Sequence, residues 1–294
     1  MSKKIYIVVG PTASGKTRFA IDLAHKIDAE ILSCDSTAIY RSFDIGTAKP
    51  TVAERTEIPH HFVDHCDWSE SFDAGKYACQ ARAKIEEVLG RGKEVIVAGG
   101  TGLYLRALMG FKFHNLPSDP DVRSELENLS NAELYNKLRA MDQKRSREIH
   151  LNDRYRLLRA VEIVLLTGKK IQDLSLETND NLSFYLIYLD PFLDDVKKCI
   201  LERIKEMLHI GFIDEVENLR KLGCPVNHKV MQSVGYREVN LFLDEKIPLS
   251  LLPLQIVQAT NQYARRQRTW FSSLKVDLHL VGTVASFLKN CPHI

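Results

Sequence analysis

A glycine-rich loop near the start of the chain constrains its fold more than any other feature. Residues Gly10-Pro11-Thr12-Ala13-Ser14-Gly15-Lys16-Thr17 match the pattern G-x-x-x-x-G-K-[ST] in full. The apolar run 5–9 precedes the loop, and after it Phe19, Leu23 and Ile27 recur at helical spacing. This order predicts a buried strand, a glycine loop and a helix, which together begin a P-loop α/β domain.

The loop predicts a binding site for a polyphosphate. The backbone N–H groups of such a loop and the N-terminus of the following helix converge on anionic oxygens. Lys16 adds a positive charge, and the Thr17 hydroxyl is a candidate ligand of Mg²⁺. Nucleotide-binding and ATP-binding proteins share this loop, so the motif predicts a polyphosphate without identifying it as ATP.

Composition limits the class of protein. The chain has 294 residues, of which 45% are hydrophobic and 27% charged, which is typical of one large globular domain or one domain with an insertion. Its six cysteines form no C-x-x-C pair and no zinc-site spacing. The sequence starts on an expected core strand without a signal peptide, and no apolar stretch reaches the length of a membrane span. We therefore expect a cytoplasmic protein with free thiols and no membrane contact.

Four apolar runs predict buried parallel strands, and each ends in residues that could do chemistry. In open α/β sheets, ligands bind at the carboxyl ends of the strands. The runs cover residues 5–9, 30–33, 95–98 and 184–189, and they end in Gly10, Cys34-Asp35-Ser36, Gly99-Gly100-Thr101-Gly102 and Asp190-Pro191. Helical patterns over 74–89 and 103–109 lie between them. The alternation predicts a mostly parallel sheet flanked by helices.

The middle of the chain has a different pattern. Residues 128–141 and 154–166 are strong helix candidates, and no strand pattern interrupts them. We therefore expect an α/β core made of residues 1–115 and 183–294, with an α-helical insertion over 116–182. Residues 197–222 and 254–274 of the core are again predicted to be helical.

Two basic clusters predict a polyanionic partner larger than a nucleotide. The net charge is only +2, so any nucleic-acid surface must be local. Residues 137–170 contain ten lysines and arginines against four acidic residues. A second cluster, Arg265-Arg266-Gln267-Arg268, precedes Thr269-Trp270. The alternative is that these charges only form a solvated helix face.

Three residues outside the loop are candidates for chemistry. Asp35 could take a proton from a nucleophile beside a diphosphate, although Asp35 or Ser36 could instead only cap a following helix. Thr101 could cap the helix after it and also offer its hydroxyl to a substrate. Arg203 could clamp a diphosphate, since its planar fork matches phosphate oxygens, or could be one surface arginine among many.

The chain resembles the tRNA dimethylallyltransferases, also called tRNA isopentenyltransferases. The resemblance covers nearly the whole chain in order. Its most specific motifs are Asp-Ile-Gly-Thr-Ala-Lys-Pro over 44–50 and Arg-Gln-x-Thr-Trp over 266–270. The other matches are the glycine loop, Asp35-Ser36-Thr37-Ala38-Ile39-Tyr40, Pro59-His60-His61, Gly-Gly-Thr-Gly-Leu-Tyr over 99–104, Asn152-Asp153 with Arg156 and Arg159-Ala160, Ser233-Val234-Gly235-Tyr236-Arg237, and Tyr263-Ala264-Arg265.

The resemblance implies transfer of a dimethylallyl group from dimethylallyl diphosphate to N6 of the adenine at tRNA position 37, beside the anticodon. The loop would hold the prenyl diphosphate with Mg²⁺ instead of hydrolysing ATP. Asp35 would be the general base, Thr101 would place the reacting groups, and Arg203 would steady the diphosphate. The implied tRNA contacts are Asp35, Ser36, Thr37, Ala38, Thr101, Arg123, Tyr155, Arg156, Leu157, Leu158, Arg159, Gln232, Ser233, Val234, Gly235, Tyr236 and Arg237. We add Arg265 and Arg266 of the second basic cluster to these contacts, and we expect a monomer.

The chain departs from the family pattern at a few positions, and three other functions are alternatives. Leu151 and Tyr155 stand where the family often has Pro and Gln, and Ser42-Phe43 replaces a common Gly-Met. A P-loop small-molecule or nucleotide kinase shares the loop but leaves the two basic clusters unexplained. A prenyltransferase of free adenine nucleotides would not need the basic insertion. A nucleotide-gated RNA-binding protein would bind without turnover.

Overall fold

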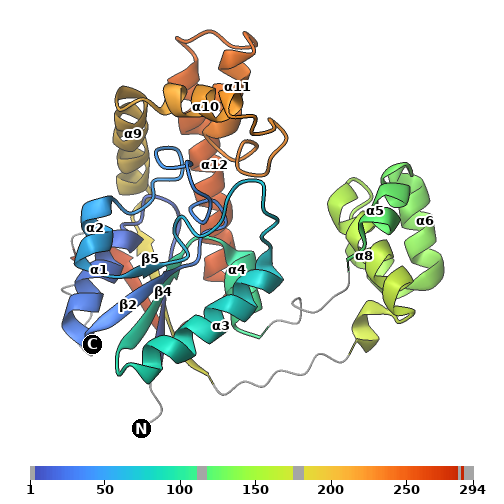
Figure 1. Cartoon of the computed structure of the whole chain (residues 1–294), viewed down its shortest axis with the longest axis horizontal. Coiled ribbons are helices and arrows are strands. Elements are labelled where there is room, and N and C mark those ends of the chain that lie inside the picture. Colours follow the sequence, from blue (N-terminus) through green and yellow to red (C-terminus); the bar gives the residue numbers. More distant parts are fainter. Residues whose placement is uncertain (1–3, 111–117, 175–181, 284–285, 288–294) are drawn as a thin grey trace. The chain divides into compact units, whose positions relative to one another are not determined.

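The computed structural model describes residues 4–110, 118–174, 182–283 and 286–287 (Figure 1). The chain divides into two compact units, one made of its first 111 residues together with those from 180 onward, the other of residues 112–179. We call them the core unit and the insertion unit. The insertion unit interrupts the core unit in sequence between its fourth and fifth strands.

A six-stranded sheet forms the centre of the core unit, in the order β3-β2-β4-β1-β5-β6. All five neighbouring pairs are parallel, which confirms the predicted mostly parallel sheet. The sequence prediction missed two edge strands, of which one has only two residues and the other alternates between exposed and buried residues. The strands are β1 (Lys4–Val9), β2 (Ala29–Ser33), β3 (His60–His61), β4 (Glu94–Gly99), β5 (Ser183–Pro191) and β6 (Leu278–Gly282).

Helices cover both faces of the sheet. Alternate residues of β1 point to opposite faces, so that Ile7 joins one hydrophobic cluster and Val8 the other. The Val8 cluster includes Phe19 and Leu23, and the Ile7 cluster includes Tyr77. The helices of this unit are α1 (Lys16–Ile27), α2 (Val52–Glu57), α3 (Ala74–Gly90), α4 (Gly102–Leu108), α9 (Leu193–His209), α10 (Phe212–Lys221), α11 (Tyr236–Leu243) and α12 (Leu252–Ser272).

The helical pattern predicted over 197–222 forms two helices. Helix α9 ends at His209 and α10 begins at Phe212. Gly211 lies between them with φ of 101°, a conformation that side chains other than hydrogen disfavour. The glycine therefore allows the chain to turn, and α10 packs against α11 instead of extending α9.

The insertion unit is a small helical bundle. Its hydrophobic core includes Leu134, Leu138 and Leu157. The helix predicted over 128–141 begins later, after Ser130, whose side chain forms a capping box with Glu133. The helices are α5 (Pro120–Glu127), α6 (Asn131–Met141), α7 (Gln143–Glu148), α8 (Arg154–Thr167) and a short 3₁₀ helix (Ile171–Asp173).

None of the helices that the structure describes combines the length and the apolar character that a bilayer crossing requires. The five cysteines within the described residues are unpaired, as expected for free thiols.

Candidate active site

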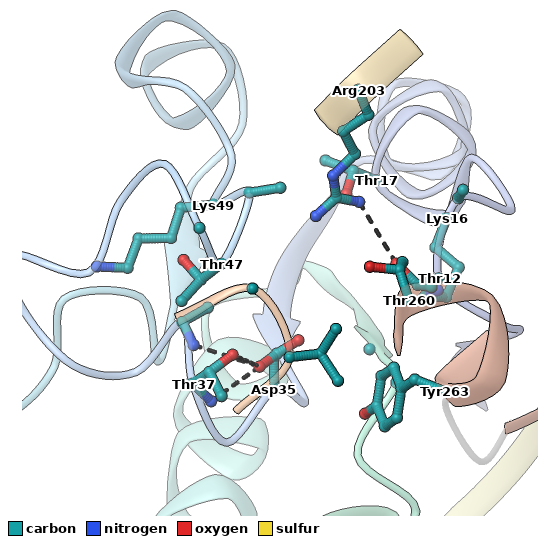
Figure 2. A pocket seen from close by; sticks show the side chains of 18 of the residues that line it. Thr12, Lys16, Thr17, Asp35, Thr37, Thr47, Lys49, Arg203, Thr260 and Tyr263 are labelled. Atoms are coloured by element: carbon teal, nitrogen blue, oxygen red, sulfur yellow. Dashed lines mark hydrogen bonds between the residues drawn. The ribbon is translucent and has the colours of Figure 1, made fainter. Parts of the chain in front are cut away.

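A cavity of about 880 Å³ lies at the carboxyl ends of three neighbouring strands, β1, β4 and β2 (Figure 2). The glycine loop after β1, the residues after β2 and the glycine turn after β4 all line it, together with side chains of α9 and α12. The ending of β5 is not among its lining residues, which corrects the expectation of four converging strand endings. Asp190 instead pairs with Arg268 at 2.9 Å and with His279 at 3.2 Å.

The glycine loop has the backbone shape of an anion site. Positive φ angles at Ala13 (62°) and Gly15 (76°) give it the left-handed turns of an anion-binding nest. Helix α1 begins at Lys16, so its N-terminus faces the cavity side of the loop. The loop and the helix dipole therefore attract negative charge to the same point.

Lys16 lies on the inner side of this loop. Its ammonium Nζ donates to the carbonyl oxygens of Gly10 at 2.9 Å and Pro11 at 2.6 Å. Removal from bulk water lowers the pKa of Lys16 to about 7, while Asp35 raises this pKa and Arg203 lowers it. An anion in the cavity would restore the charged form, because it would oppose the desolvation.

Arg203 reaches the cavity from α9. Its Nη1 donates to Thr12 Oγ1 at 3.5 Å (Figure 2). Burial lowers the pKa of Arg203, and Asp35 raises it. Two cationic side chains therefore meet the glycine loop at one wall, as a diphosphate requires.

Asp35 faces the same cavity. Its Oδ1 accepts from the Thr37 amide at 2.8 Å, from Thr37 Oγ1 at 2.6 Å and from the Ala38 amide at 3.3 Å (Figure 2). Turns and not a helix follow Asp35, so the alternative that Asp35 or Ser36 only caps a helix is wrong. Since Asp35 affects the pKa of both Lys16 and Arg203, the carboxylate lies within electrostatic reach of the cationic wall.

Thr101 connects two lining loops. It occupies the N-cap position of α4, but its side chain makes no capping hydrogen bond, contrary to that expectation. Its Oγ1 accepts instead from the Ser36 amide at 3.0 Å and donates to Ser36 Oγ at 3.3 Å. The hydroxyl therefore fixes the backbone directly after Asp35.

A metal would fit beside the loop. Among the described residues, no three His, Cys, Asp or Glu side chains gather to hold one. Mg²⁺ usually binds through few protein groups and keeps phosphate oxygens and water as its other ligands. The Thr17 hydroxyl lines the cavity at the start of α1 and could supply one such group.

Two further residues of the site, Tyr263 and Glu215, have no role in the sequence-based predictions. Tyr263 of α12 lines the cavity, and burial raises the pKa of its hydroxyl to about 12, with Asp35 acting in the same direction. Glu215 of α10 accepts from the amides of Asp44 (2.9 Å), Ile45 (2.6 Å) and Gly46 (3.2 Å). It thereby holds a loop of the cavity wall. Tyr263 belongs to a matched family motif, whereas no sequence signal identified Glu215.

Comparisons with known proteins show the family of the chain. The model of the family described as IPP transferase matches residues 38–274. The chain belongs to this family. A tRNA dimethylallyltransferase of Thermotoga petrophila is 38% identical, over 98% of this chain and 97% of the relative.

Solved structures of family members share the fold. The tRNA isopentenylpyrophosphate transferase of Bacillus halodurans superposes with a TM-score of 0.71 at 34% identity, over 95% of this chain and 90% of that one. A eukaryotic dimethylallyltransferase acting on tRNA gives a TM-score of 0.84 at 28% identity, over 99% of this chain and 77% of that one. These relatives support the prenyltransferase interpretation and not the kinase alternative.

The residues expected to contact tRNA differ in their exposure. In the core unit, Gln232, Ser233, Val234, Gly235, Arg237 and Arg266 line the cavity, and Arg265 is exposed on α12. Tyr236 is buried, and its hydroxyl donates to Glu215 Oε1 at 2.5 Å. The buried side chain of Tyr236 cannot contact tRNA directly, which corrects that expectation. Tyr236 instead supports Glu215.

The insertion unit shows the same division. Tyr155 and Arg156 are exposed at the start of α8, whereas Leu157 and Leu158 are buried in the hydrophobic core of this unit. The two leucines therefore support their neighbours instead of offering side chains to a ligand. The remaining two candidates, Arg123 and Arg159, both pair with the buried carboxylate of Glu162, at 3.0 and 2.7 Å.

Proposed function

We propose that this member of the family transfers the dimethylallyl group of dimethylallyl diphosphate to N6 of the adenosine at tRNA position 37 and releases diphosphate. One observation carries the proposal. A single cavity has an anion-binding loop with Lys16 and Arg203 on one wall and the Asp35 carboxylate within electrostatic reach of them. A carboxylate facing a diphosphate site suits the removal of a proton from a nucleophile beside the leaving group.

The chemistry follows from the two reactants. The allylic C–O bond breaks toward a delocalised cation, and its electron pair leaves with the diphosphate. Loop amides, Lys16 and Arg203 stabilise that departing charge. The N6 lone pair forms the new C–N bond, and Asp35 takes the proton that N6 loses. The adenine amine is a weak nucleophile, so holding it close to the reacting carbon supplies much of the acceleration.

Apolar side chains lie where the hydrocarbon tail would bind. Ile204 and Met207 of α9, Phe212 of α10 and Ile256 of α12 line the cavity. A five-carbon tail packed there would be removed from water while its diphosphate faces the loop. We assign the Thr17 hydroxyl as a ligand of Mg²⁺, which would neutralise part of the diphosphate charge.

The tRNA would be held by its phosphates and by the shape of the anticodon stem-loop. The exposed Arg156 and Tyr155 of the insertion unit and Arg237 and Arg266 of the cavity rim offer such contacts. The target adenine must leave its stack to enter the cavity, as in base flipping. We propose a monomer, acting in the cytoplasm where tRNA is found.

Labelled substrate tests the proposal directly. The protein is incubated with radiolabelled dimethylallyl diphosphate and unmodified tRNA, and in parallel with labelled ATP or with AMP as acceptor. Label in tRNA, mapped to the adenosine beside the anticodon, is the expected result. Label on free AMP, phosphate transfer from ATP, or binding without any transfer would each overturn it in favour of one named alternative.

A further inference from the structure

A glutamine of α12 joins two loops of the active site. Gln267 is 8% exposed, and its carboxamide lies between the glycine loop and the glycine turn after β4. Its Oε1 accepts from the Thr12 amide at 2.7 Å, and its Nε2 donates to the Gly100 carbonyl at 3.0 Å. These partners lie 255 and 167 residues away in sequence.

The two partners of Gln267 require a side chain that both donates and accepts hydrogen bonds. A backbone amide can only donate and a backbone carbonyl can only accept, so the residue between them must do both. A carboxylate would meet the Gly100 carbonyl with a second acceptor, and a cationic side chain would meet the Thr12 amide with a second donor. Neither replacement could satisfy both backbone groups.

Each hydrogen bond leads to one half of the reaction site. On the diphosphate side, Thr12 places its hydroxyl 3.5 Å from Arg203 Nη1. On the side of the base, Gly100 precedes Thr101, whose Oγ1 accepts from the Ser36 amide next to Asp35. Gln267 therefore bridges the loop that would hold the leaving group and the glycine turn whose Thr101 holds the backbone next to Asp35.

Close packing makes the bridge short. A Cβ at Gly100 would lie 2.6 Å from Gln267 Nε2, and a Cβ at Gly102 would lie 2.8 Å from the Trp270 ring. Gln267 and Trp270 are three residues apart and face the same side of α12. The Arg-Gln-x-Thr-Trp and Gly-Gly-Thr-Gly motifs are thus two complementary halves of one contact.

We propose that Gln267 is a positioning residue that sets the spacing between the diphosphate cradle and the Asp35 carboxylate. This inference rests on the proposed prenyl transfer. Gln267 would act through Thr12 and Thr101, without touching the reacting atoms. Since misplacing reacting groups by about 1 Å can cost about 100-fold in rate, its loss should slow the chemical step more than it weakens binding of either substrate.

Two substitutions of Gln267 test the bridge. Gln267→Met keeps the length of the side chain and removes both hydrogen bonds, whereas Gln267→Glu keeps the shape and the acceptor but not the donor. With saturating tRNA and dimethylallyl diphosphate, we expect the single-turnover rate to fall about 30- to 100-fold in both variants. Dissociation constants for tRNA and for an unreactive prenyl diphosphate analogue should stay within about threefold.

Gly100→Ala and Gln258→Met provide independent checks. In Gly100→Ala the residue at 267 is still glutamine, but the alanine Cβ would displace its carboxamide. This variant should therefore also slow the single turnover. Its effect should not add to that of Gln267→Met, because both break the same contact. Gln258 is exposed on the same helix, and Gln258→Met should behave like the parent.

The outcomes separate this inference from the proposed function. A parent protein that transfers no label to tRNA contradicts the function itself. An active parent with an unchanged single-turnover rate in Gln267→Met overturns the bridge. Equal losses of rate and of both affinities would also overturn it, since they indicate general collapse of the site. If the methionine variant does not fold, as judged by circular dichroism, Gln267→Glu and Gly100→Ala decide the question.

Discussion

The hydroxyl of Thr101 holds the backbone amide of Ser36 at 3.0 Å across 65 residues of sequence. This contact joins the glycine turn after β4 to the loop after β2, at the residue that follows Asp35. The position of the carboxylate therefore depends on a side chain from another strand ending.

Replacing Thr101 should loosen the loop that carries the proposed base. Thr101→Ala removes the hydrogen bond from the Ser36 amide, worth about 1 kcal/mol, together with the longer one to Ser36 Oγ, and we expect a fall of about tenfold in the single-turnover rate. Thr101→Ser retains the hydroxyl and should recover most of the rate. Equal activity in the alanine variant and the parent would show that the rest of the loop positions Asp35 without this bond.

Asp35 should be essential for turnover but not for tRNA binding. Asp35→Asn keeps an acceptor for the Thr37 amide and removes the base, so the turn should persist while the rate falls by at least about 100-fold. Affinity for tRNA, measured by filter binding, should stay within a few-fold. Thr37→Val is the matched control, because it removes one donor to Asp35 and leaves the carboxylate. A parental single-turnover rate in Asp35→Asn would remove Asp35 from this role.

Binding of the diphosphate should take up a proton at Lys16. Its pKa of about 7 in the free protein must rise when an anion binds beside it. Affinity for an unreactive prenyl diphosphate should thus be highest below pH 7 with respect to this group, and should fall by up to about tenfold per pH unit above it.

Calorimetry in buffers of different ionisation enthalpy measures this uptake. At pH 8 we expect most of one proton per site, because the free lysine is then largely neutral and the bound one charged. Lys16→Arg keeps its charge at every pH tested and should show almost no uptake. Uptake that is the same in both proteins would assign the proton to another group.

Arg156 and Arg159 should contribute differently to tRNA binding. Arg156 is 69% exposed and lies 3.3 Å from Asp153, whereas Arg159 is 24% exposed and pairs with Glu162. Arg156→Ala should weaken tRNA binding and reduce the slope of log affinity against log salt by about 1. Arg159→Ala should also weaken binding, with part of the loss arising from the freed carboxylate. If the salt dependence of tRNA affinity is unchanged in Arg156→Ala, Arg156 has a structural role and does not contact a phosphate.

Glu162 should stabilise the insertion unit. Desolvation acts to raise the pKa of this carboxyl, but donation from Arg159, Ser118 and the Asp119 amide outweighs it and leaves the pKa below its ordinary value. Glu162→Ala would remove the acceptor of four hydrogen bonds, two of them from arginines, and should lower the free energy of unfolding by about 3 kcal/mol.

The pH dependence of unfolding provides a second measure of how much Glu162 stabilises the insertion unit. Because its pKa is lowered in the folded protein, its stabilising contribution is present above the ordinary value of 4.5 and is lost as pH falls below it. Denaturant titrations at pH 7 and pH 4 should therefore differ less in Glu162→Gln than in the parent. The exposed Glu125 offers a control, since Glu125→Gln should leave both titrations unchanged.

Local patterns predicted many elements of the fold. The glycine loop, the four long strands and the helices over 74–89 and 154–166 depend on alternation, helical spacing and turn residues, which a short stretch of sequence contains. The edge strand β3 is too short to show a pattern, and the five residues of β6 alternate in burial over too short a run to stand out. Their pairing with β2 and β5 depends on the neighbours that the fold supplies.

The sequence by itself determined the chemistry available to this protein: a phosphate loop, a carboxylate at a strand end, and basic helices. Only the tertiary structure decided which groups meet. The Thr101 hydroxyl bonds to Ser36 instead of capping its own helix, Leu157 and Leu158 are buried, and Gln267 lies between Thr12 and Gly100. The physical reason is distance along the chain. Hydrogen bonds between residues 65 to 255 positions apart depend on how packed elements direct their side chains, and no local periodicity encodes that direction.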